Sequence, residues 1–212
     1  QPVDIVASSE VQMCTYDGTR PGDKYLMNNG GEALLSIDEG GLNLGTVVAS
    51  VVKHGSVPAI AGSRQCDAPL PSVGPVGGDE MYLPREFEVT TTAIYPLASP
   101  VTVSLYFTQD ELNALSVATN NASSEYQNCW GTVASDGSNL MLTIRHSDNT
   151  QETRTQGGGG LTITPNAGPN GSFKASFQVN KFSGFQLHGN GGVNGANGLP
   201  VTYLYFDASA VN

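Results

Sequence analysis

The stretch VTVSLYFTQDEL, residues 101–112, decides the fold of this chain. From 101 to 107 its odd-numbered positions are Val, Val, Leu and Phe, and the even positions between them are Thr, Ser and Tyr. Apolar residues at every second position are typical of a β-strand with one face in a core and the other toward solvent. The sequence therefore predicts a half-buried strand over residues 101–107, with Phe107 pointing into the core.

The residues that follow this strand predict the start of a helix. Thr108 can cap the first turn with its hydroxyl, and Glu111, three residues later, can reach back to the Thr108 backbone. This pattern is a capping box. The adjacent acids Asp110 and Glu111 are also compatible with a metal site or an acid–base pair. We favour the interpretation that they complement the helix dipole.

The body of this helix is predicted from its apolar side. Leu112, Leu115 and Val117 recur at helical spacing, and the helix is expected to end near residues 120–121, where two asparagines follow each other. No other segment carries a comparable helix signal, so one short helix is expected in the chain.

Strand-like segments dominate the rest of the chain. Glycine-rich breaks separate many of them, and Pro84 interrupts one, because proline has no backbone N–H for a sheet ladder. This spacing predicts an all-β, antiparallel β-sandwich, Ig-like or jelly-roll-like, with one short α-helix and long Gly/Pro-rich loops. The predicted strands are 11–16, 32–37, 46–52, 81–92, 101–107, 140–144, 161–164, 172–179, 182–188 and 201–206.

The domain organisation follows from length and from the loops. We expect one β-sandwich domain over residues 1–198, with a division into two subdomains near 58–79 as the alternative. Residues 199–212 are expected to form a terminal strand or the start of a further module. Segments 58–78, 157–160 and 190–198 are rich in glycine, with proline in the first, and are predicted to be mobile connections.

Composition and charge restrict the partners. Charged residues make up 13% of the chain, about half the usual ~25%, and the formal net charge is −10. An acidic domain repels phosphate backbones, so no nucleic-acid partner is expected. The chain lacks the ~18-residue apolar run of a membrane helix, so no membrane insertion is expected. The composition is typical of an extracellular protein, secreted or on the outer cell surface.

Three cysteines bear on redox state and metal binding. Cys14, Cys66 and Cys129 are not in CxxC spacing, which argues against structural zinc. A Cys14–Cys66 disulfide is favoured, because both residues lie in the N-terminal half beside turn-rich segments. The other two pairings, and three buried free thiols, remain open alternatives.

The single tryptophan is the main candidate for ligand binding. Trp130 follows Cys129 and lies near Tyr126. Exposed Trp and Tyr can stack on sugar rings, so these two residues are the candidate ligand-binding residues. The alternative, which we favour, is a tryptophan packed in the core or against a disulfide.

No catalytic motif marks an active site. His54, His146 and His188 are scattered, and the HExxH and GxSxG motifs are absent. His146 precedes Ser147 and Asp148, but adjacent residues point in different directions, so a triad there is geometrically poor. We expect no catalytic residues and no enzyme, and we interpret the histidines as polar residues at strand ends.

No Gly-rich phosphate loop and no EF-hand pattern is present. The acidic pairs Asp38–Glu39 and Asp79–Glu80 lie beside glycines and could contribute carboxylates to calcium. We therefore expect no cofactor, with calcium as the alternative and its ligands unassigned.

Two regions resemble a known family. The sequences FSGF at 182–185 and LPVTYLYFDA at 199–208 resemble a pattern common in proteins secreted by the type IX system of Bacteroidetes. The sequences MYLPREF at 81–87 and PVTVSLYFT at 100–108, followed by Glu111, are similar to modules of the same cargo proteins. The resemblance covers residues 80–118 and 172–212. It contains no catalytic residue.

The resemblance implies a β-sandwich module located just upstream of the C-terminal modules of a larger protein. We therefore expect a non-catalytic accessory module that spaces, presents or adheres, and whose partners are neighbouring domains of the same polypeptide. A glycan or a surface protein is a further candidate partner. The alternatives are a carbohydrate-binding module and, second, a secreted hydrolase.

Overall fold

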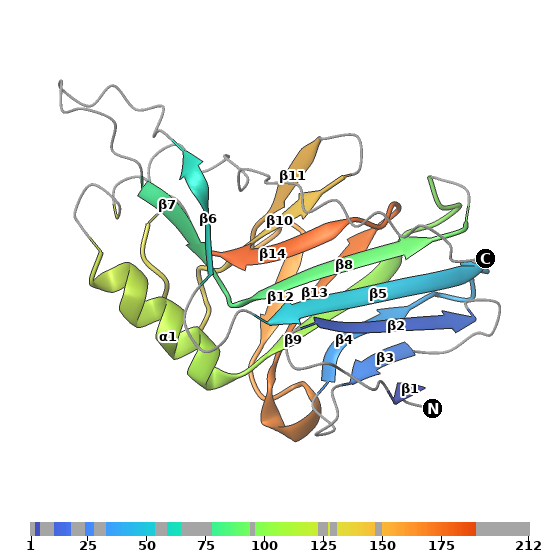
Figure 1. Ribbon diagram of the computed structural model, residues 1–212, viewed down its shortest axis with the longest axis horizontal. Helices are drawn as coiled ribbons and strands as arrows, with labels where there is room; N and C mark the ends of the chain where they lie inside the picture. The colour runs from blue at the N-terminus through green and yellow to red at the C-terminus, as the bar shows by residue number, and fades with distance from the viewer. Residues whose placement is uncertain are drawn as a thin grey trace.

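The computed structural model shows a two-layered β-protein (Figure 1). Side chains are described from residue 33 onward, apart from those of 59–64, 78–81 and 169. The structure describes residues 3–4, 11–17, 24–27, 33–53, 59–64, 78–93, 96–122, 127, 131–146 and 150–189. No helix in this described part is long and apolar enough to cross a membrane.

The first sheet has six described strands. Neighbouring strands within this sheet run antiparallel, except for the short parallel pair β1–β3. Their order is β1 (Val3–Asp4), β3 (Lys24–Met27), β4 (Ala33–Asp38), β9 (Val101–Phe107), β13 (Phe173–Val179) and β12 (Leu161–Thr164).

The second sheet has eight described strands, all paired antiparallel. A hairpin of β6 (Ala59–Arg64) and β7 (Gly78–Tyr82) joins it beside β14. The order of the others is β11 (Gln151–Arg154), β10 (Met141–Arg145), β14 (Gly184–His188), β8 (Arg85–Thr91), β5 (Thr46–Lys53) and β2 (Val11–Asp17). The predicted all-β sandwich is therefore confirmed.

Strand β9 lies in the middle of the first sheet, at the predicted bounds. Its Val and Leu side chains and Phe107 are buried in one continuous core between the sheets. The opposite face is not solvated as predicted, because Tyr106 is only 2% exposed. The Tyr106 hydroxyl lies 2.9 Å from Ser36 Oγ, and its ring lies against Gly168, where a Cβ would come within 2.6 Å of it. The loop containing the 3₁₀ turn η1 (Pro169–Gly171) thus covers part of this face.

Helix α1 (Gln109–Asn120) confirms the predicted capping box. The Glu111 N–H donates to Thr108 Oγ1 at 3.2 Å, and the Thr108 N–H donates to Glu111 Oε2 at 2.8 Å. Leu112 and Leu115 are fully buried, as predicted. Val117 is 59% exposed, so its assignment to the apolar side was wrong. The two buried leucines are three positions apart, so they share one side of the helix, and position 117 falls on the other side.

The glycine run at 157–160 differs from the mobile connection that its composition predicted. It forms a hydrogen-bonded turn that leads from β11 in the second sheet to β12 in the first. The Thr155 N–H donates to the Gly159 carbonyl at 3.2 Å, and the Leu161 N–H donates to the Thr155 carbonyl at 3.1 Å. Gly158 has φ of +112°, a conformation that L side chains rarely adopt. The glycines are therefore needed for the geometry of this turn.

The predicted loop 58–78 is also partly wrong, because β6 and the start of β7 lie within it. Pro84 separates β7 from β8, as expected for a residue without a ladder N–H. The predicted domain bounds 1–198 and 199–212, and the division near 58–79, stay predictions. Residues 65–77 and 190–212, including the predicted strand 201–206, lie outside the described residues.

Candidate functional site

Most of the residues predicted for ligand binding and disulfide formation lie outside the described part. Trp130, Tyr126 and Cys66 are among them. Cys14 lies in β2 opposite Ala49, but its side chain is not described. Sugar stacking by Trp130 and Tyr126 and the Cys14–Cys66 pairing therefore stay predictions.

The acidic pairs proposed for calcium do not converge where their side chains are described. Asp38 is exposed, and its Oδ1 accepts a hydrogen bond from the Gly40 N–H at 3.0 Å, whereas Glu39 is fully buried. The Asp79 and Glu80 side chains in β7 are not described. Within the described part, no three His, Cys, Asp or Glu residues form a group that could hold a metal ion.

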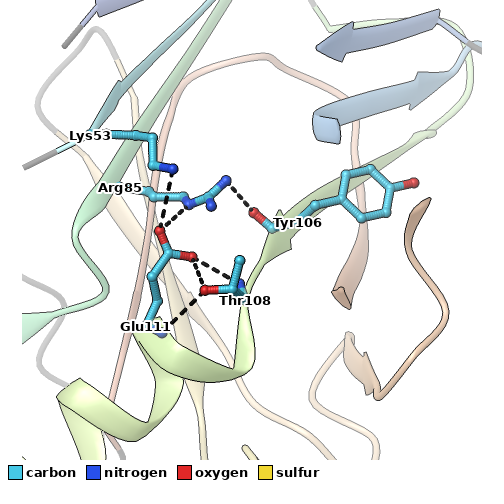
Figure 2. Close-up of polar contacts among 5 residues, drawn as sticks. All are labelled: Lys53, Arg85, Tyr106, Thr108 and Glu111. Atoms are coloured by element: carbon cyan, nitrogen blue, oxygen red, sulfur yellow. Dashed lines mark hydrogen bonds and ion pairs between the residues drawn. The ribbon is translucent and has the colours of Figure 1, made fainter. Parts of the chain in front are cut away.

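A cluster of largely buried charges lies between the two sheets and the helix (Figure 2). Arg85, the first residue of β8, is 0% exposed. Its Nε donates to Glu111 Oε1 at 2.8 Å, and its Nη1 donates to the Tyr106 carbonyl at 3.1 Å. Lys53 Nζ, at the end of β5, lies 3.9 Å from the same Glu111 oxygen. The Arg85–Glu111 pair thus ties together β5, β8, β9 and α1.

The second oxygen of this carboxylate is occupied by the cap. Glu111 Oε2 accepts from the Thr108 N–H at 2.8 Å and from the Thr108 hydroxyl at 3.1 Å. A carboxylate offers about four lone-pair sites, and here both oxygens are engaged by donors of the same chain. A general base needs an oxygen directed at a substrate proton. The arrangement is suited to holding the fold, and it disfavours the acid–base interpretation of Asp110 and Glu111.

A second cluster resembles a catalytic triad. His146 Nδ1 lies 2.6 Å from Ser183 Oγ, and His146 Nε2 lies 3.8 Å from Glu152 Oε1. The latter distance is too long for a hydrogen bond. Ser183 is only 6% exposed, although a nucleophile must reach its substrate. Glu152 also accepts from Arg154 Nη2 at 3.1 Å. The adjacent Ser147 and Asp148 lie outside the described residues.

A third group lies on the face of the second sheet that is turned away from the core. His188, at the end of β14, has Nδ1 2.8 Å from the Gly189 carbonyl and Nε2 2.8 Å from Thr143 Oγ1. Because a carbonyl only accepts, Nδ1 carries a proton. Both ring nitrogens therefore make hydrogen bonds within the chain. His146 and His188 both occupy strand ends, as predicted, while His54 lies outside the described residues.

Tyr82 and Glu86 belong to the same face. The Tyr82 hydroxyl donates to Glu86 Oε1 at 3.1 Å, and the amide of Gln186 donates to the same oxygen. Burial raises the pKa of the Tyr82 phenol well above its ordinary value, and the Glu86 carboxylate raises it further. Tyr82 is therefore a neutral hydrogen-bond donor over the whole physiological range.

A polar groove with a volume of about 540 Å³ lies on the outer face of the first sheet. Strands β9, β12 and β13 form its floor, and the end of β11 forms one wall. The sequence did not predict it, because the residues alternate with core residues in separate strands. Its polar lining comes from Thr102, Arg154, Thr162, Ser176, Gln178 and Asn180.

No family model, no curated protein and no solved structure matches this chain.

Proposed function

We propose that this chain is a non-catalytic, extracellular accessory module of a larger secreted or cell-surface bacterial protein, which spaces, presents or adheres. The observation that carries the proposal is the use of the buried ionisable groups. Arg85 and Glu111 are engaged by each other and by neighbouring backbone and cap groups, and His188 is satisfied by Thr143 and Gly189. Groups used in this way stabilise a scaffold.

The type IX cargo family remains the proposed origin. The stretch 80–118, which resembles those modules, contains both Arg85 and Glu111, and these two side chains form the buried pair (Figure 2). A sequence pattern that includes both partners of a buried contact reflects the requirements of the fold. The same fold can serve many different functions. This supports the accessory role over the hydrolase, whose Ser183–His146–Glu152 candidate lacks a hydrogen bond between histidine and glutamate.

Surface display in a bacterium with a type IX system tests this role. A reporter is joined through this chain to a sorting domain, and protease shaving measures how much reporter reaches the surface. We expect more displayed reporter with the chain than without it. Arg85→Met, which breaks the buried pair, should abolish the gain, and Arg145→Gln, at a half-buried arginine of β10, should retain it. Equal display with and without the chain would contradict the proposal.

A second candidate, a carbohydrate-binding module, is favoured by the polar groove on the first sheet.

A further inference from the structure

We propose that the groove on the outer face of the first sheet binds a neutral oligosaccharide. This inference rests on the proposed extracellular role, which it deepens by naming a ligand class and a place for it. The groove is lined by hydroxyl and amide groups, each of which can both donate and accept hydrogen bonds. Saccharide hydroxyls have the same double capacity.

The strand register arranges these groups as a grid. Thr102 of β9 lies directly opposite Gln178 of β13, and Ser176 of β13 lies directly opposite Thr162 of β12. Residues two apart on a strand are separated by about 7 Å, and neighbouring strands by about 4.8 Å. The four side chains therefore lie at the corners of a small field on this face, where Ser176 Oγ also lies 3.0 Å from Ser104 Oγ. Such a field suits the repeated hydroxyls of a sugar chain.

The charge of the groove argues for a neutral ligand. Arg154 is the one charged residue among those lining the described groove, and its Nη2 already donates to Glu152 Oε1 at 3.1 Å. Its side chain lies along the end of the glycine turn, where a Cβ on Gly160 would be 3.4 Å from Arg154 Cδ. The chain as a whole carries a formal charge of −10, which repels polyanions. A uronic-acid polymer or a phosphorylated ligand is therefore disfavoured.

The lining also argues against an apolar peptide. Phe177 and Val179 contribute to the groove, but they are only 3% and 4% exposed because their side chains lie in the core. Pro100 is the exposed apolar residue of the lining. Without an exposed aromatic ring in the described groove, stacking contributes little, and we expect dissociation constants of about 1 mM.

The test is an NMR titration of the ¹⁵N-labelled 212-residue chain. The probes are cello-, xylo-, manno- and malto-oligosaccharides at up to about 10 mM, roughly ten times the expected dissociation constant. We expect saturable shifts of the amides of Thr102, Ser176, Gln178 and Asn180 with at least one probe. An oligogalacturonate is the charged comparison and should bind more weakly.

Two variants place the ligand. Thr102→Val removes a hydroxyl while keeping a β-branched side chain, and Gln178→Ala removes an exposed amide. Each should weaken binding about tenfold, the effect of one lost hydrogen bond. The matched control is Thr90→Val, at an exposed threonine of β8 in the other sheet, which should bind like the wild type.

Three results would overturn the proposal. The first is the absence of saturable shifts at the groove with every probe, and the second is unchanged binding in both groove variants. The third is binding that Trp130→Ala abolishes and Thr102→Val leaves intact, which would place the sugar at Trp130. None of these results decides the surface-display experiment, so failure of the groove and failure of the accessory role are distinguishable.

Discussion

Arg85 Nε lies 2.8 Å from Glu111 Oε1, and this buried pair connects the start of β8 to the first turn of α1 (Figure 2). The two residues are 26 positions apart in the chain. Glu111 thus has two structural roles. It caps its own helix, and it neutralises Arg85, a fully buried arginine of the second sheet.

The pair predicts a large loss of stability when one partner is removed. Arg85→Met keeps most of the side-chain volume but leaves the Glu111 carboxylate buried without its closest cation. We expect a loss of about 3–5 kcal/mol in the free energy of unfolding, measured by urea denaturation. The double variant Arg85→Met/Glu111→Gln should lose less than the sum of the two single variants. Additive losses would show that the two side chains do not interact.

Substitutions of Phe107 test which face of the central strand β9 lies in the core. Its ring is 1% exposed and stacks on Phe173 with ring centroids 5.2 Å apart. Phe107→Ala should cost about 3–5 kcal/mol, and Phe107→Asp should unfold the domain, because it places an unpaired charge in the core. Val117→Asp, at the exposed valine of α1, is the control and should change stability by less than about 0.5 kcal/mol. A melting temperature of Phe107→Asp equal to that of the wild type would contradict the placement of β9.

The glycine turn predicts a cost that a mobile linker would not show. A Cβ at Gly159 would lie 2.7 Å from the Thr155 carbonyl oxygen, so Gly159→Ala forces the turn to shift. We expect a loss of roughly 1–3 kcal/mol in thermal unfolding. Gly157→Ala has open space and only a left-handed backbone, with φ of +70°, and should cost about 1 kcal/mol. Equal, negligible effects of both substitutions would favour the mobile connection.

Tyr82 predicts a loss of stability at high pH. Burial, and then the nearby Glu86 carboxylate, raise the pKa of its phenol above the ordinary value of 10.0. In the unfolded chain the phenol loses its proton near pH 10, whereas in the folded chain it keeps it. The folded state then binds more protons, so stability is complete below pH 10 and falls as the pH rises toward the folded pKa. Urea denaturation between pH 8 and 11 measures this.

Tyr82→Phe is the control for the pH dependence. This variant lacks the ionisable group, so its stability should fall less steeply above pH 10 than that of the wild type. Ultraviolet titration near 295 nm should also show one fewer late-titrating tyrosine. A wild-type slope in the variant would show that Tyr82 ionises in the folded protein as it does in the unfolded chain.

Local patterns allowed much of the fold to be predicted. The bounds of β9 and the cap of α1 follow from residues within a few positions of each other, since alternation and capping are local effects. Strand β11 has the sequence QETR and contains no apolar residue, so it left no hydrophobic pattern. It forms because it pairs with β10 at the edge of a sheet.

The clusters could not be predicted, because they depend on sheet register. Arg85 meets Glu111 only after β8 and α1 are placed, and Ser183 meets His146 across 37 residues. The groove has the same origin, since Thr102, Gln178 and Thr162 become neighbours through the β9–β13–β12 order. The capping box did identify Glu111, but it gave no indication of its arginine partner.

The most direct test of the non-catalytic role is a turnover screen of the purified chain with fluorogenic ester, glycoside and peptide substrates, together with labelling by a fluorophosphonate. The account predicts no turnover above background and no label on Ser183, because this serine is buried and its histidine lacks a hydrogen-bonded carboxylate. Turnover that Ser183→Ala abolishes without a change in melting temperature would contradict it and would establish a hydrolase.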